Sequence, residues 1–232
     1  MLNTLTVVVT KMATEDNLSD VDFVLETQLM NLDAVTSKRK IRLFCCACTR
    51  RAWKLLSRYY QHTVEVAEVV SDSPESEENM LQLYSVAEKV DVSHYRRKCA
   101  RRAAAWCVHP DMSAVSIARS VASSVSKTVK SRDVERRIQL ELLRDIIGSQ
   151  SIQSFDDTKM RLWRTGAVVD IAASAYENRL LPLGHIDSHK LGELADALED
   201  AGCSDADILA HCRGLGPHVR GCWVVDLILG KQ

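Results

Sequence analysis

Glycine and proline are scarce in this chain, and their scarcity limits the folds available to it. The 232 residues contain 9 glycines and 4 prolines. Folds built from many short strands need frequent turns, which glycine and proline largely supply. Apolar residues instead recur every three or four positions, the period of a helix with one buried face. The sequence therefore predicts an all-α fold, a compact multi-helix bundle of about ten helices.

The apolar period also places the individual helices, most of which end at a glycine, a proline or a polar loop. The strongest stripe runs from Ile41 to Tyr59 and includes Cys45 and Cys48. Because these two cysteines lie on the stripe, we interpret them as buried thiols; the alternative is a zinc or iron–sulfur site shared with Cys99 and Cys107. The predicted helices span 17–34, 41–59, 62–70, 76–90, 93–107, 112–130, 133–147, 159–178 and 188–201, followed by a short helix capped by Ser204 and a last helix from Pro217 to Gly230.

A polar stretch after Gly148, "SQSIQSFDD", predicts a boundary between two helical subdomains. The predicted organisation is an N-terminal extension (1–16), a first subdomain (17–148), a linker (149–158) and a second subdomain (159–232). No apolar run approaches the roughly 18–20 residues of a membrane span. The first residues do not resemble a signal peptide, and eight cysteines without an export signal predict reduced thiols in the cytoplasm.

The net charge of −1 conceals strong segregation of charge along the chain. Residues 38–58 contain eight Lys and Arg and no acid, residues 65–91 contain eight Asp and Glu, and residues 94–137 are basic again. Two interpretations stay open: a phosphate-binding surface for nucleic acid, or neutralisation of the basic segments by the acidic one within the fold. The candidate nucleic-acid contacts are Lys38, Arg39, Lys40, Arg42, Arg50, Arg51, Lys54, Arg96, Arg97, Lys98, Arg101 and Arg102.

Cysteines and histidines gather near the C-terminus, between Cys203 and Cys222. On one helix from Pro217, His218, Cys222 and Asp226 share a face, and Zn²⁺ takes four N, S or O ligands in a tetrahedron. The candidate zinc ligands are Cys212, His218, Cys222 and Asp226, with His211 as an alternative fourth ligand. In the competing interpretation the segment is two capped helices with core thiols. The buried Asp226 then needs a partner, for which the candidates are Arg213, Arg220 and His218.

Residues 194–231, "LADALEDAGCSDADILAHCRGLGPHVRGCWVVDLILGK", closely resemble the C-terminal segment of a large group of uncharacterised planctomycete proteins. The stretches "RKIRLFCCACTRRAWKLL" and "LLRDIIG" resemble the same group in the same order. Residues 94–130 depart from the group, because they are basic and rich in Ser and Val where the group is rich in Ala and Trp. The resemblance implies one continuous helical unit, and it implies no known activity or catalytic residue.

An enzymatic reaction has little support in the residues. Neither a phosphate-binding glycine loop nor a paired-carboxylate motif is present, and His211 and Cys212, as neighbours on a helix, point about 100° apart. We therefore predict a non-enzymatic helical interaction module without a cofactor, an adaptor or subunit that binds a protein partner. The first alternative is a nucleic-acid-binding accessory protein that uses the basic helices 38–58 and 94–102. The second is a thiol-ligated zinc protein.

Overall fold

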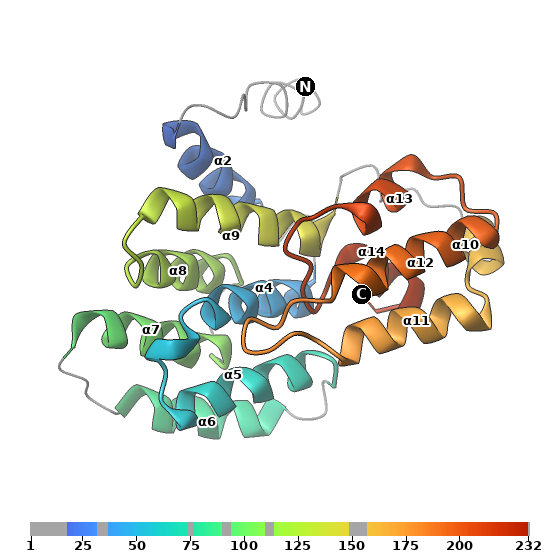
Figure 1. Cartoon of the computed structure of the whole chain (residues 1–232). Coiled ribbons are helices and arrows are strands. Elements are labelled where there is room, and N and C mark those ends of the chain that lie inside the picture. Colours follow the sequence, from blue (N-terminus) through green and yellow to red (C-terminus); the bar gives the residue numbers. More distant parts are fainter. Residues whose placement is uncertain are drawn as a thin grey trace.

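The computed structural model describes residues 18–31, 37–73, 77–89, 94–109, 114–148 and 157–231. Strand pairing in these ranges is limited to two isolated bridges, 180 with 185 and 185 with 219. The all-α prediction is confirmed (Figure 1). The helices are α2 (Leu18–Met30), α4 (Lys38–Arg50), the 3-10 helix η1 (Trp53–Leu55), α5 (Arg58–Ser71), α6 (Glu77–Lys89), α7 (Tyr95–Cys107), α8 (Ala114–Ser126), α9 (Arg132–Ile147), α10 (Asp157–Trp163), α11 (Gly166–Glu177), α12 (Ser188–Asp200), α13 (Ala206–Arg213) and α14 (Trp223–Leu229).

Two hydrophobic cores lie on either side of the predicted linker. One is formed by buried residues of α2 to α9 together with Val219, and the other by buried residues of α10 to α14. The predicted extension 1–16 and residues 149–156 of the linker lie outside the described residues, so the domain boundaries stay a prediction. Within the described part of the chain, no helix combines the length and apolar character that a membrane span requires.

Helix α4 is the centre of the first core. It packs against α5, α7, α8 and α9, and Figure 1 shows it between α8 and α5. Cys45 and Cys48 are fully buried in this helix, and burial is the main reason that their thiol pKa values lie well above the usual range. These observations agree with the interpretation of both cysteines as core residues.

The apolar stripe from Ile41 to Tyr59 is divided among α4, η1 and the start of α5, and does not form the single helix that was predicted. Helix α4 ends at Arg50, and Leu56 is extended, with φ −87° and ψ 137°. The side-chain amide of Gln61 donates to the carbonyls of Trp53 and Leu56, each at 3.3 Å, and so ties the start of α5 to the turn. The chain therefore reverses here while apolar residues continue to face the core.

The second half of the chain divides one predicted helix around a buried aromatic residue. Trp163 and Trp223 both lie in the second core, where they are 7% and 6% exposed. The predicted helix 159–178 is instead α10 and α11. The hydroxyl of Thr165 accepts from the backbone N–H of Val168 and caps the start of α11, so the chain changes direction between the two.

The last helix starts later than predicted. Helix α14 begins at Trp223, and the preceding segment from 214 to 222 is not helical. Asp205, and not Ser204, caps α13, since its carboxylate accepts from two backbone N–H groups. Because His218 precedes α14, it does not share a helix face with Cys222 and Asp226. The spacing on which the predicted ligand set was based is therefore absent from the structure.

Candidate metal centre

Four side chains with metal-ligating atoms converge where α9 meets the C-terminal half of the chain. Asp145 lies in the last turn of α9, His211 in the last turn of α13, and His218 in the segment between α13 and α14. Cys222 is the N-cap residue of α14. One ligand atom from each of these residues lies within 4.8 Å of the other three, and no second such group occurs among the described residues. These four residues are a candidate site for a metal ion, and we call them the metal centre.

The backbone places His218 and Cys222 in this position. The N–H of Ile186 donates to the carbonyl of His218 at 2.7 Å and holds the segment before α14 in place. Gly221 has φ 92°, in the left-handed region, and the chain turns there just before Cys222. A Cβ atom at Gly221 would lie 2.9 Å from the Cδ1 of Leu43. Glycine is thus required here for both conformation and space.

The carboxylate of Asp145 is the hub of the metal centre. Its Oδ1 lies 2.7 Å from His218 Nδ1 and 3.2 Å from His211 Nε2. His211 Nε2 also lies 3.2 Å from Cys222 Sγ. A single imidazole nitrogen therefore faces a carboxylate oxygen and a sulfur at once. It cannot donate one proton well to both, whereas a shared cation would bind all three atoms.

Backbone groups fix the orientation of two of these side chains. The Nε2–H of His218 donates to the carbonyl of Gly214 at 3.2 Å, and Asp145 Oδ2 accepts from the N–H of Val219 at 2.9 Å. Metal-binding histidines commonly donate their second ring N–H to a carbonyl or carboxylate, which selects the tautomer that binds the metal. His218 Nδ1 and Asp145 Oδ1 thus remain directed toward the other two ligands.

Burial and mutual contact determine the protonation of these groups in the metal-free protein. Burial alone raises the pKa of Asp145, but hydrogen bonds from His211 and His218 outweigh burial and hold that pKa below its usual value. Burial lowers the pKa of His218, and contact with Asp145 outweighs it in the other direction. Cys222 is 0% exposed; burial and then the negative charge of Asp145 raise its thiol pKa well above the usual range. The negative charge of Asp145 therefore raises the pKa of both His218 and Cys222.

The donor set suits Zn²⁺. Zinc binds Cys, His and carboxylate ligands at about 2.0–2.3 Å in a tetrahedron, whose edges are then about 3.3–3.8 Å long. The ligand atoms all lie within 4.8 Å of one another. To reach this spacing the longer separations would shorten, and the 2.7 Å contact of His218 Nδ1 with Asp145 Oδ1 would lengthen by about 0.6–1.1 Å. Calcium and magnesium require oxygen ligands, and here a single carboxylate supplies the only side-chain oxygen among the four donors. Bound zinc would displace the thiol proton of Cys222.

The predicted zinc ligands divide between this site and other parts of the fold. His218 and Cys222 belong to the metal centre, and so does His211, the alternative fourth ligand. Cys212 and Asp226 lie outside it. Cys212 is buried in the second core, where burial raises its thiol pKa to about 12.

Asp145 is a candidate ligand that was not predicted from the sequence. It is 4% exposed and lies on the inward face of α9, between the buried Leu142 and Ile146. The sequence does contain a signal for Asp145, because a carboxylate is unfavourable on the apolar face of a helix. It is also unfavourable in the last turn, where the helix dipole repels negative charge.

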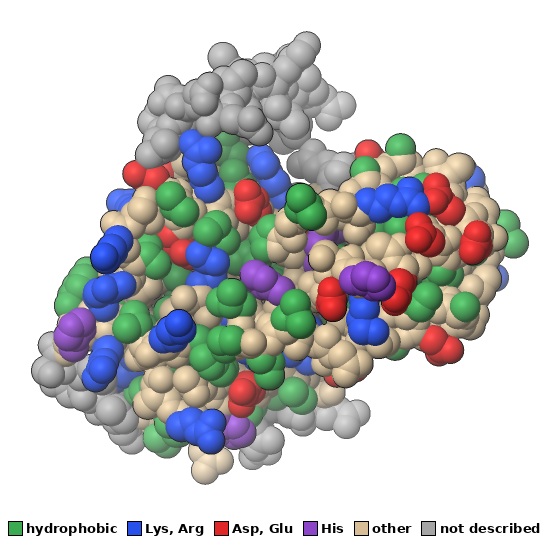
Figure 2. All heavy atoms as spheres, in the orientation of Figure 1, with side chains coloured by type: hydrophobic (Ala, Val, Ile, Leu, Met, Phe, Trp, Pro, Cys, Tyr) green, Lys and Arg blue, Asp and Glu red, His purple; other side chains and the backbone are tan. Residues whose placement is uncertain are grey.

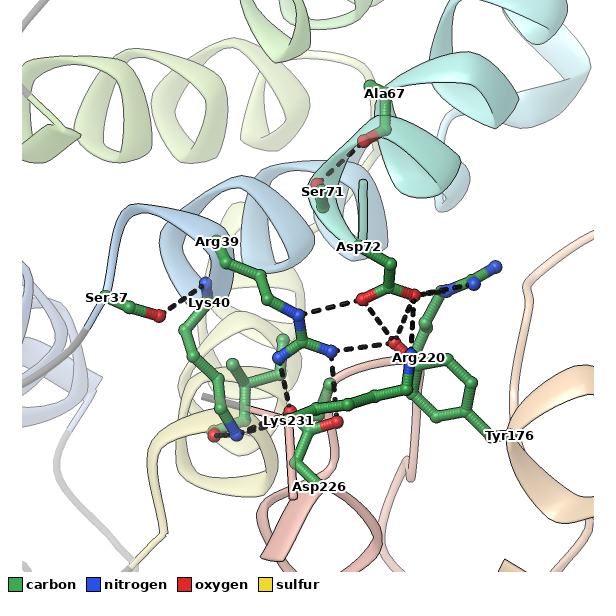
Figure 3. Close-up of polar contacts among 12 residues, drawn as sticks. Ser37, Arg39, Lys40, Ala67, Ser71, Asp72, Tyr176, Arg220, Asp226 and Lys231 are labelled. Carbon is green, nitrogen blue, oxygen red and sulfur yellow. Dashed lines mark hydrogen bonds and ion pairs between the residues drawn. The ribbon is translucent and has the colours of Figure 1, made fainter. Parts of the chain in front are cut away.

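Asp226 binds two cations of α4. Its Oδ2 lies 2.7 Å from Arg39 Nη1 and 2.8 Å from Lys40 Nζ, and its side chain is 1% exposed (Figure 3). The partners predicted for Asp226 all bind other carboxylates, so that prediction is wrong: Arg213, Arg220 and His218.

A larger buried cluster extends from this ion pair. Asp72, at the end of α5, accepts from Arg39 at 2.8 Å, from Tyr176 at 2.8 Å and from Arg220 at 2.7 Å. Arg220 also stacks on the ring of Tyr176, with its guanidinium carbon 4.7 Å from the ring centroid. Figure 3 shows these side chains arriving from α4, α5, α11 and the region of α14. We call the cluster the charge network: Arg39, Lys40, Asp72, Tyr176, Arg220, Asp226 and Lys231.

The basic residues of 38–54 are mostly bound within the fold. Besides Arg39 and Lys40, the buried Arg50 pairs with Glu68 at 2.5 Å and Arg51 pairs with Glu135 at 2.7 Å. Arg42 donates to the carbonyl of Cys107. Among the nucleic-acid contacts predicted within 38–54, the exposed side chains are those of Lys38 and Lys54. The acidic segment 65–91 thus neutralises part of the basic one, as one of the two interpretations expected.

The second basic segment has the opposite character. Arg96, Arg97, Lys98 and Arg102 are exposed at α7. Arg101 is half-buried and donates to the carbonyl of Ala87. Most of the predicted contacts from 96–102 therefore lie at the surface, whereas most of those from 38–54 do not.

The chain was compared with protein-family models, with curated proteins and with solved structures, and nothing matches in any of the three. The resemblance to uncharacterised planctomycete proteins stays a prediction.

Proposed function

We propose that the protein is a non-enzymatic helical binding module whose two cores are clamped together by one Zn²⁺ ion. The observation that carries the proposal is the convergence of one carboxylate, two imidazoles and one thiol, with backbone groups orienting two of them. Asp145 comes from the helix that lines the first core, and the other ligands come from the C-terminal half. One ion bound by all four therefore holds α9 against α13 and the start of α14.

The geometry favours a structural role for the metal over a catalytic one. Catalytic zinc keeps one coordination position for water or substrate, whereas four protein ligands complete the tetrahedron. The same atoms make a poor Cys–His–Asp triad. In such a triad the acid and the nucleophile contact opposite nitrogens of the imidazole, but Asp145 and Cys222 both face Nε2 of His211. A thiol that is 0% exposed is also closed to substrate.

The test is the metal content of the full-length protein purified without added metal. We expect one zinc per chain by elemental analysis. Reconstitution with Co²⁺ should give the intense visible absorption of a tetrahedral site and a sulfur-to-cobalt charge-transfer band, because Cys222 supplies a thiolate.

Two matched variants separate the ligand from an ordinary core thiol. Cys222→Ala and Cys212→Ala each remove one buried sulfur from the same region. Cys222→Ala should lose zinc and the charge-transfer band, and Cys212→Ala should keep both. Wild-type protein without bound metal that also fails to take up Zn²⁺ or Co²⁺, or equal metal loss in the two variants, would overturn the proposal.

A further inference from the structure

One edge of the N-terminal half is strongly basic along the chain, since residues 94 to 132 contain a single acidic residue, Asp111. Residues 94–109 and 114–132 contain nine Lys and Arg and no Asp or Glu. Arg119 and Arg132 bind carboxylates of α2, and Arg101 is half-buried. The other six are exposed, and we call them the basic face: Arg96, Arg97, Lys98, Arg102, Lys127 and Lys130.

The fold brings the two parts of the basic face together. The Nε–H of Arg96 donates to the carbonyl of Thr128, which ties the first turn of α7 to the turn after α8. Lys127 and Lys130 lie in that turn and its continuation. Figure 1 shows the start of α7 and the end of α8 at the same edge of the molecule, and Figure 2 shows Lys and Arg side chains spaced along it.

These charges do not contribute to the fold as ion pairs. Within the described residues, Arg97 and Lys98 have no ion pair, and Arg102 stacks on the ring of Trp106, 4.4 Å from its centroid, which leaves its charge in place. Positive side chains in the first turn of a helix are opposed by the helix dipole, by about 0.3–1 kcal/mol each. Folding alone therefore gives no reason to concentrate cations at the start of α7.

The composition of the surface indicates the class of partner. Protein interfaces have an apolar or aromatic centre, and a helix that lies on a membrane needs an apolar face. Tyr95, 63% exposed, is the one exposed large hydrophobic residue within 94–109 and 114–132 of the described chain. Phosphate backbones require only cations, and a single aromatic ring is enough to stack one base. We infer that the basic face binds the sugar–phosphate backbone of a nucleic acid.

This inference is independent of the metal centre, so it is tested on metal-replete full-length protein. Labelled RNA and DNA of mixed sequence, each single- and double-stranded, are titrated by fluorescence anisotropy at several salt concentrations. With four to six phosphates neutralised, affinity should fall by on the order of 10²–10³-fold between 50 and 200 mM salt. The four nucleic acids determine which strand form and sugar the face prefers.

A matched pair of variants locates the binding site. Arg97→Glu/Lys98→Glu reverses two charges of the basic face, and Lys159→Glu/Arg161→Glu reverses two exposed charges of α10. The first variant should weaken binding at least about tenfold, because each lost phosphate contact removes about one unit of salt slope; the second should leave it within about twofold. Circular dichroism of both variants is the control for correct folding. No binding at low salt, equal effects of the two variants, or tighter binding to anionic vesicles or polyglutamate would overturn the inference.

Discussion

The charge network and the metal centre lie on the same junction between the two halves of the molecule, and they solve the problem of buried polarity differently. In the charge network, every carboxylate contacts at least two cationic groups, and Asp72 also accepts from the hydroxyl of Tyr176. In the metal centre, one nitrogen of His211 is shared by Asp145 and Cys222, and among the described residues no Lys or Arg pairs with the carboxylate. The first cluster is complete from its own side chains, and the second is best completed by an ion.

This difference teaches that burial of charge does not by itself identify a functional site. Both clusters contain buried aspartates and perturbed pKa values. What separates them is whether donors and acceptors match without an added atom, because an unmatched buried polar group costs free energy. The comparison predicts that removal of a side chain should disrupt the charge network, and that removal of zinc should affect only the metal centre.

The largest expected effect is loss of Asp226. The Asp226→Ala variant leaves Arg39 and Lys40 without their buried carboxylate, which should lower the free energy of unfolding by about 3–5 kcal/mol. Urea denaturation measures the change, and zinc content should stay at one per folded chain. Asp196→Ala is the control, since the exposed pair of Asp196 with Arg213 is worth at most about 1 kcal/mol. Similar small losses in the two variants would contradict a central role for the network.

Removal of zinc should come next in size. A ligand that binds only the folded state adds about 2.7 kcal/mol at one hundred times its Kd and about 4.1 kcal/mol at one thousand times. A chelator should therefore lower the melting temperature of wild-type protein, and scanning calorimetry records the shift. The Cys222→Ala variant is the control and should not respond. A chelator response that persists in this variant would place the metal elsewhere.

Acid should weaken the charge network before the hydrophobic cores. Burial raises the pKa of Asp72, but contacts with Tyr176, Arg220 and Arg39 outweigh it and lower that pKa from 3.8 to about 2. Because the folded pKa is depressed, the stabilisation is present above about pH 4 and is lost as the pH falls through about 2. A shift of this size corresponds to about 2 kcal/mol. Asp72→Asn should flatten the stability profile in this window, and an unchanged acid limb would disprove the assignment.

The smallest effect is expected from the hydroxyl of Tyr176. It donates to Asp72 and accepts from Arg39, both at 2.8 Å. The Tyr176→Phe variant keeps the ring on which Arg220 stacks and removes only these hydrogen bonds, so the loss should be about 1–2 kcal/mol. Thermal unfolding measures it, and a loss as large as that of Asp226→Ala would mean that the ring has moved.

Local sequence patterns were sufficient to predict most of the helices, but they were insufficient to predict contacts between residues far apart in the chain. The apolar stripe that contains Cys45 and Cys48 predicted a buried helix correctly, because burial of one face follows from helical period alone. The break after Arg50 was missed, since the stripe continues across it and the turn is bound by the distant amide of Gln61. The late start of α14 was also missed, because the fixed φ of Pro217 suits a non-helical segment as well as the first turn of a helix.

The sequence indicated the ligands of the metal centre that lie close together along the chain, and it did not indicate Asp145. His218 and Cys222 are neighbours along the chain, so their clustering was evident without a structure. Asp145 is brought to them by packing of α9 against α14, which no local period encodes. The partner of Asp226 was likewise predicted within its own segment, whereas the structure supplies Arg39 from the first turn of α4.

That last pairing has a consequence for the order in which the protein is assembled. Arg39 and Asp226 are 187 positions apart. At a synthesis rate of about 5–20 residues per second, the cations of α4 exist for about 10–40 s before the ribosome has made their carboxylate. During that interval the first turn of α4 has no anionic partner from α14, and Asp72 is the one carboxylate of the charge network already made. The charge network is therefore completed only when the C-terminal helices dock.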